Sequence, residues 1–260
     1  MNDLSAAELS DFLRAKAQQY ATQSFISDDP IQIPHAFEAT ADIEISGLIA
    51  ATLSWGNRKT IIAKSKELMD RMDQSPADFI ANASPEDLQA LNGFKHRTFT
   101  DEDIKGLVVA LQVLYRDYPN LGAFFMQHLN ESATNLGPAF HAFKSYLLAN
   151  GLPARGGKHF GDPYTGSACK RMVMYSRWMV RPNTEGIDFG LWKEISPALL
   201  SIPLDVHSGR VGRSLGLLTR KQNDWKAVCE LDDSIRKILP QDPAQLDYAL
   251  FGLGVYEGWT

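Results

Sequence analysis

A lysine at the start of a predicted helix is the first residue whose position suggests chemistry. Lys170 follows the glycine-containing turn at residues 166–169 in the segment GSACKRMVMYSRWMVR. A helix N-terminus carries partial positive charge, which disfavours an ammonium group, and the neighbouring Arg171 acts in the same direction. A neutral amine is a nucleophile, so Lys170 is a candidate for covalent catalysis. The alternative is a solvated lysine whose stem packs on Tyr164 or Met174.

A second candidate is a carboxylate at another predicted helix start. In the segment SIPLDVHSGRVGRSLGLL, Pro203 forces an extended entry and Asp205 stands immediately before the helix. Aspartate at this position typically caps a helix. A carboxylate at an apolar turn can also stabilise positive charge that develops at a sugar carbon. The two roles are compatible, so Asp205 is a candidate for both.

A short polar turn, Trp55-Gly56-Asn57-Arg58-Lys59, joins two predicted helices. Such a tip can enter a nucleic-acid groove, with Asn57 filling the space of an extruded base and Trp55 offering a stacking surface. The alternative is an ordinary hairpin turn in which Gly56 provides a positive φ and Asn57 bonds to the backbone.

The net charge of −5 conceals an uneven distribution along the chain. Residues 141–226, the basic block, hold 13 Lys and Arg against 6 Asp and Glu, or 13 − 6 = +7, whereas the remainder holds 13 against 25, or −12. This pattern predicts one surface for a polyanion on a chain whose remainder repels it. Ordinary fluctuation of solvated charge is the alternative. The cations of the block include Arg155, Lys158, Lys170, Arg171, Arg177, Arg210 and Arg213.

The elements that must position these residues are predicted to be helices. Helical spacing of apolar residues recurs throughout and strand patterns are scarce, so the expected fold class is all-α. We expect a nearly apolar core helix over residues 43–55, capped by Asp42 and ended by Gly56-Asn57. Loops are expected at residues 24–34 and 150–166. Further helices are expected over residues 4–20, 59–72, 101–118, 136–149, 168–180, 206–217, 224–238 and 243–256.

Composition excludes several classes of protein. With 260 residues, 44% of them hydrophobic, the chain can bury a substantial core and is not intrinsically disordered. No apolar run approaches the ~18 residues of a membrane span, and the N-terminus lacks the order of a secretion signal, so we expect a soluble, cytoplasmic protein. Cys169 and Cys229 show no metal-binding spacing, so we expect neither a metal nor another cofactor.

The order of these features resembles that of the helix-hairpin-helix DNA glycosylase superfamily. Residues 45–69 are similar to the helix pair that carries the wedge residue, Lys170 occupies the place of the lysine nucleophile, and PLDVHSGRVGRSLGLL is similar to the segment with the superfamily's aspartate. DYALFGLG is similar to the last core helix. The archaeal 8-oxoguanine glycosylase branch is nearest, because it also has a long lysine-to-aspartate separation. The chain resembles, in addition, a bacterial family of unknown function through DPIQIPHAF, FKHRTF, SACKR, RWMVR, PLDVH, RKQNDW and ALFGLG.

The glycosylase resemblance implies a two-lobed fold and a mechanism. Residues 1–260 would form a single helical unit of two interleaved lobes, acting as a monomer on double-stranded DNA and associated with the nucleoid when bound. A damaged base, such as an oxidised purine, is flipped out of the duplex. Lys170 attacks the anomeric carbon, Asp205 stabilises the cationic sugar, and the resulting Schiff base permits cleavage at the abasic site. The DNA-contacting residues are then Asn57, Arg58, Lys158, Arg171, Arg177, Arg210 and Arg213, and the base pocket contains Trp55 and Cys169.

Two other functions are compatible with the sequence. A non-catalytic nucleic-acid-binding protein would keep the same scaffold without turnover, and trapping of a covalent adduct distinguishes it from an enzyme. A metal-dependent helical hydrolase would use Asp28, Asp29, His35, Asp205 and His207, although these residues lack the usual HxxxH or repeated HD spacing. Cys169 beside Lys170 can be interpreted as a redox thiol or as a small apolar residue of the turn.

Overall fold

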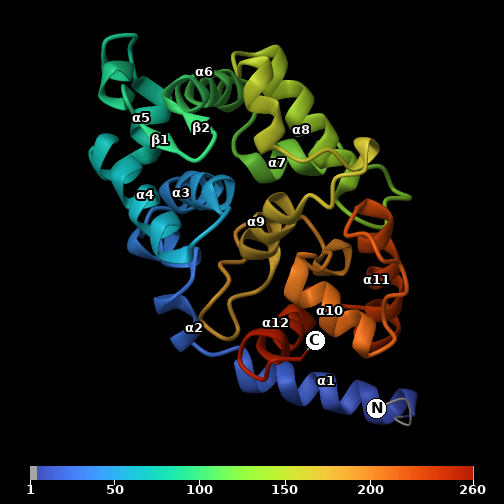
Figure 1. Cartoon of the computed structure of the whole chain (residues 1–260). Coiled ribbons are helices and arrows are strands. Elements are labelled where there is room, and N and C mark those ends of the chain that lie inside the picture. Colours follow the sequence, from blue (N-terminus) through green and yellow to red (C-terminus); the bar gives the residue numbers. More distant parts are fainter. Residues whose placement is uncertain (1–4, 260) are drawn as a thin grey trace. The chain divides into compact units, whose positions relative to one another are not determined.

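The computed structural model describes residues 5–259, which are mostly helical (Figure 1). The all-α class is therefore confirmed. Two short strands, β1 (Lys95–His96) and β2 (Phe99–Thr100), pair antiparallel. The α-helices are α1 (Ala6–Tyr20), α2 (Ser24–Ser27), α3 (Thr40–Leu53), α4 (Arg58–Arg71), α5 (Pro76–Asn82), α6 (Asp101–Asp117), α7 (Leu121–Gln127), α8 (Gly137–Ala149), α9 (Lys170–Val180), α10 (Val206–Ser214), α11 (Trp225–Ile238) and α12 (Asp247–Val255). Short 3-10 helices cover Pro30–Gln32, Pro34–Ala36, Asp87–Leu91, Ala154–His159, Pro163–Thr165, Pro197–Leu199 and Pro243–Leu246.

The chain forms two compact units that alternate along the sequence. Unit 1 comprises the residues up to Phe25, Glu131–Gly137 and everything from Asp162 onward. Unit 2 comprises Ile26–Asn130 and Pro138–Gly161. The basic block is consequently divided, with residues 141–161 in unit 2 and residues 162–226 in unit 1.

The core of unit 1 is formed by the apolar faces of α1, α10, α11 and α12. Leu13, Val211, Leu231 and Leu250 are completely buried within it. The helix α12 is apolar on nearly all sides, which is why it lies inside the unit rather than on its surface. Its Gly252 faces α1 so closely that an added Cβ would lie 2.0 Å from Cδ2 of Tyr20.

The core of unit 2 is centred on α3, in which every residue from Ile43 to Leu53 is buried. One of these residues is a carboxylate. Glu44 accepts hydrogen bonds from the Tyr115 hydroxyl at 2.5 Å and from the Leu121 backbone N–H at 3.1 Å. A buried charge is tolerated only when it is hydrogen-bonded, so Glu44 ties the central helix to α6 and to the start of α7.

Several element boundaries differ from those expected. Asp42 lies in the first turn of α3, which Ala39 precedes as N-cap, and its carboxylate accepts from the Ala77 backbone N–H at 2.8 Å. The helix expected over residues 168–180 begins only at Lys170, because Cys169 has a left-handed φ of 50°. The one expected to end at residue 217 ends at Ser214, before Gly216 with φ 71°. Residues 24–34, expected as a loop, contain α2 and a 3-10 turn, and the expectations omitted α5, α7 and the two strands.

The contact between α1 and α12 predicts that Gly252→Ala destabilises the protein. A Cβ at 2.0 Å from the Tyr20 ring forces the two helices apart, and overpacking of this kind costs about 1–3 kcal/mol or more. Gly212→Ala is the matched control, because the added Cβ in α10 would lie no nearer than 3.5 Å to its neighbours. Urea denaturation should show a lower free energy of unfolding for Gly252→Ala than for wild type. For Gly212→Ala it should lie within about 1 kcal/mol of the wild-type value. Equal stabilities would contradict this packing.

Candidate active site

Lys170 is the first residue of α9, as the sequence indicated. The turn before it is held by Ser167, whose Oγ accepts from the Cys169 backbone N–H at 3.2 Å and whose carbonyl accepts from the Cys169 thiol at 3.2 Å. Cys169 itself is buried, so its observed role is to support this turn. The Lys170 side chain is 37% exposed, which leaves its ammonium group within reach of a ligand.

Asp205 is the N-cap of α10, and its two carboxylate oxygens have different partners. Oδ1 accepts from the backbone N–H groups of His207 at 2.8 Å and Ser208 at 3.0 Å, which satisfies the first turn of the helix. Oδ2 lies 3.2 Å from Nζ of Lys170. The structure therefore brings the two strongest candidates of the sequence together, and the capping role of Asp205 coexists with the ion pair. We call these two residues the Lys170–Asp205 pair.

The pair keeps the carboxylate ionised. Burial acts to raise the pKa of Asp205, but the charge of Lys170 and the hydrogen bonds from the Ser208 and His207 backbone outweigh burial. The pKa of Asp205 consequently lies below its usual range. An ionised carboxylate beside a lysine at two helix N-termini is an arrangement that can stabilise a positively charged sugar next to an amine nucleophile.

Two buried arginines follow Lys170 on the same side of the helix, one within α9 and one at its C-cap. Arg177 and Arg181 follow Lys170 at positions i+7 and i+11, and they are 3% and 1% exposed. Arg177 Nε donates to Asp188 at 3.3 Å and its Nη1 donates to Asp247 at the start of α12. Arg181 donates to the other oxygen of Asp188 at 3.1 Å. These ion pairs fix the orientation of α9 against the segments that pair with it.

Asp247 links Arg177 to the Lys170–Asp205 pair electrostatically. Burial raises the pKa of Asp247 to about 6; the charge of Arg177 opposes this rise, and the charge of Asp205 adds to it. Nothing in the sequence around Asp247 distinguished it from a residue of an ordinary core helix. Its partner on α9 is remote in sequence, and only the tertiary structure reveals the contact.

The other cations expected to contact DNA differ in their solvent exposure and in their partners within the protein. Arg177 is 3% exposed and donates to two carboxylates, so its guanidinium is already used within the protein. Arg213 is half-buried and donates to the carbonyl groups of Arg220 at 2.8 Å and Lys221 at 3.0 Å. Arg171 is also half-buried, and burial lowers the pKa of its guanidinium to about 10. Arg210 in unit 1 and Lys158 in unit 2 are exposed.

In unit 2, the turn between α3 and α4 has the geometry of a capped hairpin. Gly56 has φ 114°, and the Asn57 side chain caps α4 by accepting from the Thr60 backbone N–H at 3.3 Å, next to a half-buried Arg58. Trp55 is 48% exposed, and the guanidinium of Arg97 lies 4.3 Å from its ring centre. Arg97 belongs to the β1–β2 hairpin, which the sequence did not indicate. The only signal was its presence in the motif FKHRTF.

The residues of the metal-hydrolase alternative are distributed over both units. Asp28, Asp29 and His35 belong to unit 2, and Asp29 caps a 3-10 turn through the Ile31 backbone N–H at 3.0 Å. Asp205 and His207 belong to unit 1. Across residues 5–259, no group of three His, Cys, Asp or Glu side chains is arranged to hold a metal ion. None of the helices in that range is both long and apolar enough to cross a membrane.

Comparison with known proteins identifies the family of the chain. It belongs to the family described as "Protein of unknown function (DUF2400)", whose model matches residues 29–256. This confirms the resemblance to a family of unknown function. Searches of curated proteins and of solved structures gave no match. The relationship to helix-hairpin-helix glycosylases accordingly stays a prediction.

The raised pKa of Asp247 predicts a pH dependence of stability that Asp247→Asn removes. An ordinary aspartate has a pKa of 3.8, whereas burial raises that of folded Asp247 to about 6, so the folded state keeps its proton at a pH where the unfolded state has lost it. The free energy of unfolding therefore falls as the pH rises from about 4 to about 6, by up to about 3 kcal/mol. Urea denaturation at a series of pH values should show that wild type loses stability relative to the variant over this range. A difference that is constant with pH would contradict the assignment.

Proposed function

We propose that the protein is a DNA glycosylase with Schiff-base lyase activity, built on a helix-hairpin-helix glycosylase fold and acting on a damaged base in double-stranded DNA. The observation that carries the proposal is the 3.2 Å contact between Lys170 Nζ and Asp205 Oδ2, two residues far apart in the sequence. Each stands at the N-terminus of a different helix in unit 1, and both side chains are accessible enough to meet a ligand.

The first step is attack of the Lys170 amine on C1′ of the damaged nucleotide. The ammonium must lose a proton first, and the low pKa of Asp205 makes its carboxylate a poor lasting acceptor, so this proton passes to the departing base or to solvent. The C1′–N bond to the base breaks as the new C1′–N bond to the lysine forms. Positive charge develops on the sugar in between, and the ionised Asp205 stabilises it.

The second step uses the covalent link to cleave the strand. The sugar ring opens to give an imine between Lys170 and C1′, which acidifies the proton on C2′. Loss of that proton expels the 3′ phosphate by β-elimination, and hydrolysis releases the lysine. Asn57 is the proposed wedge residue, with the exposed Trp55 as a stacking surface and Arg210 and Lys158 as phosphate contacts. An oxidised purine such as 8-oxoguanine is the proposed target.

Lys170→Gln should abolish the covalent adduct that borohydride reduction traps on lesion-containing duplexes. The glutamine has no amine to form an imine, and it retains helix propensity at a partly exposed position. Lys237→Gln, an exposed lysine in the last turn of α11, is the control and should leave the adduct at the wild-type level. A panel of duplexes, each with one lesion, identifies the base. An adduct of undiminished yield in the Lys170 variant would rule out this nucleophile.

Asp205→Asn should retain the fold and lower single-turnover base release by about 100-fold, because an amide can cap a helix but cannot stabilise a cation. Asp87→Asn is a control outside the proposed site. Asp87 lies in unit 2, where its carboxylate accepts from the Ser84 backbone N–H at 2.9 Å. We expect this control to keep the wild-type rate. Equal rates of base release in the two variants would show that Asp205 only caps α10 and has no catalytic role.

A further inference from the structure

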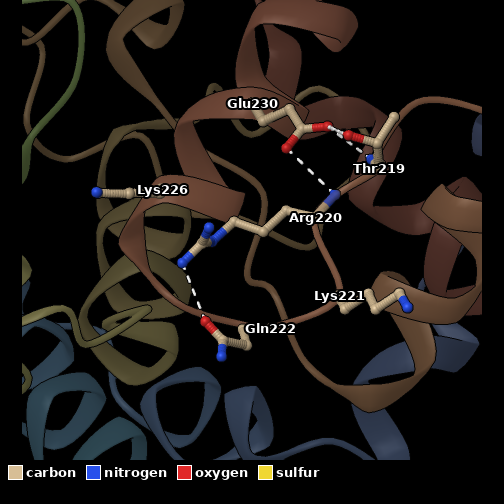
Figure 2. A pocket seen from close by; sticks show the side chains of 6 residues that line it. All are labelled: Thr219, Arg220, Lys221, Gln222, Lys226 and Glu230. Carbon is tan, nitrogen blue, oxygen red and sulfur yellow. Dashed lines mark hydrogen bonds between the residues drawn. The ribbon is translucent and has the colours of Figure 1, made fainter.

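The loop between α10 and α11 forms a shallow depression on unit 1. We refer to residues 219–226, which comprise the end of this loop and the first two residues of α11, as the 219–226 loop. Together with the first turns of α11 it contributes the lining of the depression, shown in Figure 2: Thr219, Arg220, Lys221, Gln222, Lys226 and Glu230.

The negative charges of this depression are occupied by contacts within the loop. Glu230 accepts from the backbone N–H and the hydroxyl of Thr219, both at 2.6 Å, and from the Arg220 backbone N–H at 3.3 Å. The Arg220 guanidinium is bound in turn to the carboxylate of Asp224. The carboxylates therefore fix the shape of the loop, and the lining still holds three cationic side chains, Arg220, Lys221 and Lys226, against the one carboxylate of Glu230.

Two lysines in the lining have no such contacts. Lys221 and Lys226 are exposed, and Figure 2 shows them on opposite sides of the depression. Within the part of the chain that the structure describes, neither side chain has a hydrogen bond or an ion pair. Two ammonium groups without a counter-charge, beside the amide of Gln222, make a surface that favours an anion over a neutral ligand.

The 219–226 loop is attached directly to both segments that carry the Lys170–Asp205 pair. The Asn223 side chain donates to the Asp205 carbonyl at 2.8 Å. The Trp225 backbone N–H donates to the carbonyl of Gly166, in the turn that precedes Lys170, at 3.2 Å. Arg213 braces the loop from α10 through the Asn223 amide oxygen at 2.7 Å. These hydrogen bonds therefore hold the depression next to the Lys170–Asp205 pair.

We propose that the 219–226 loop binds the phosphodiester backbone of DNA next to the Lys170–Asp205 pair, with Lys221 and Lys226 each facing a phosphate. The identity of the polyanion rests on the proposed function, since a nucleotide that reaches Lys170 brings its flanking phosphates with it. A lysine offers phosphate a mobile point charge, so the contact would position the strand without reading its sequence.

The test is the salt dependence of binding to an undamaged duplex, measured by fluorescence anisotropy from 50 to 200 mM KCl. Each phosphate contact contributes about 0.9 to the log–log slope, so Lys221→Ala/Lys226→Ala should flatten the slope by about 1.8. Lys237→Ala is the matched control, because Lys237 is also an exposed lysine and lies at the other end of α11 from Lys226, without an ion pair among residues 5–259. Circular dichroism verifies the fold of each variant, and Lys221→Gln/Lys226→Gln replaces the alanine pair if the latter does not fold.

A slope that flattens in the loop variant and stays unchanged in the control supports the proposal. An unchanged slope in the loop variant overturns it, and so does equal flattening in both variants. A loss confined to single-stranded RNA of the same length, with duplex DNA binding intact, also overturns it. The salt dependence of binding does not depend on catalysis. If the slope flattens as expected but no lesion gives a trapped adduct, the glycosylase activity is contradicted and the phosphate site is still supported.

Discussion

The pairing of two buried arginines, Arg177 on α9 and Arg181 at its C-cap, with carboxylates is the constraint on which the candidate site depends. A guanidinium buried without a partner would cost several kcal/mol, so Arg177 and Arg181 must meet carboxylates wherever α9 packs. Asp188 serves both arginines, and Asp247 at the start of α12 completes the set around Arg177. Since these contacts determine which face of α9 turns toward its carboxylates, they also determine the direction of Lys170 two turns earlier on that face.

The two oxygens of the Asp205 carboxylate have different partners, so its structural role and its proposed chemical role do not exclude each other. Oδ1 is used by the helix cap, which holds the carboxylate in one rotamer, and Oδ2 is left facing Lys170. The N-terminus of α10 favours this negative charge, whereas the N-terminus of α9 disfavours the ammonium group of the lysine. The ion pair offsets that second effect.

Short sequence patterns were enough to predict those parts of the site that depend only on neighbouring residues in the chain. The positions of Lys170 and Asp205 at helix starts follow from a glycine turn, a proline and a capping aspartate, all within a few residues. The partners of Arg177 could not be predicted, because they lie 11 and 70 positions away and no short-range pattern joins them. The stacking of Arg97 on Trp55 was missed for the same reason, since it requires a two-residue strand pair that carries almost no periodicity.

Tertiary pairing also changes the meaning of the charge distribution. Many cations of the basic block neutralise the protein's own carboxylates or satisfy its carbonyl groups, and these are Arg155, Arg177, Arg181, Arg213 and Arg220. A balance of +7 therefore overstates the positive charge that a polyanion would meet. Among residues 5–259, the exposed cations of unit 1 without internal partners include Arg210 on α10, Lys221 in the loop that follows it and Lys226 at the start of α11. The Asn223 side chain ties the segment with the two lysines to the Asp205 carbonyl, so their charges belong to the part of unit 1 that carries the Lys170–Asp205 pair.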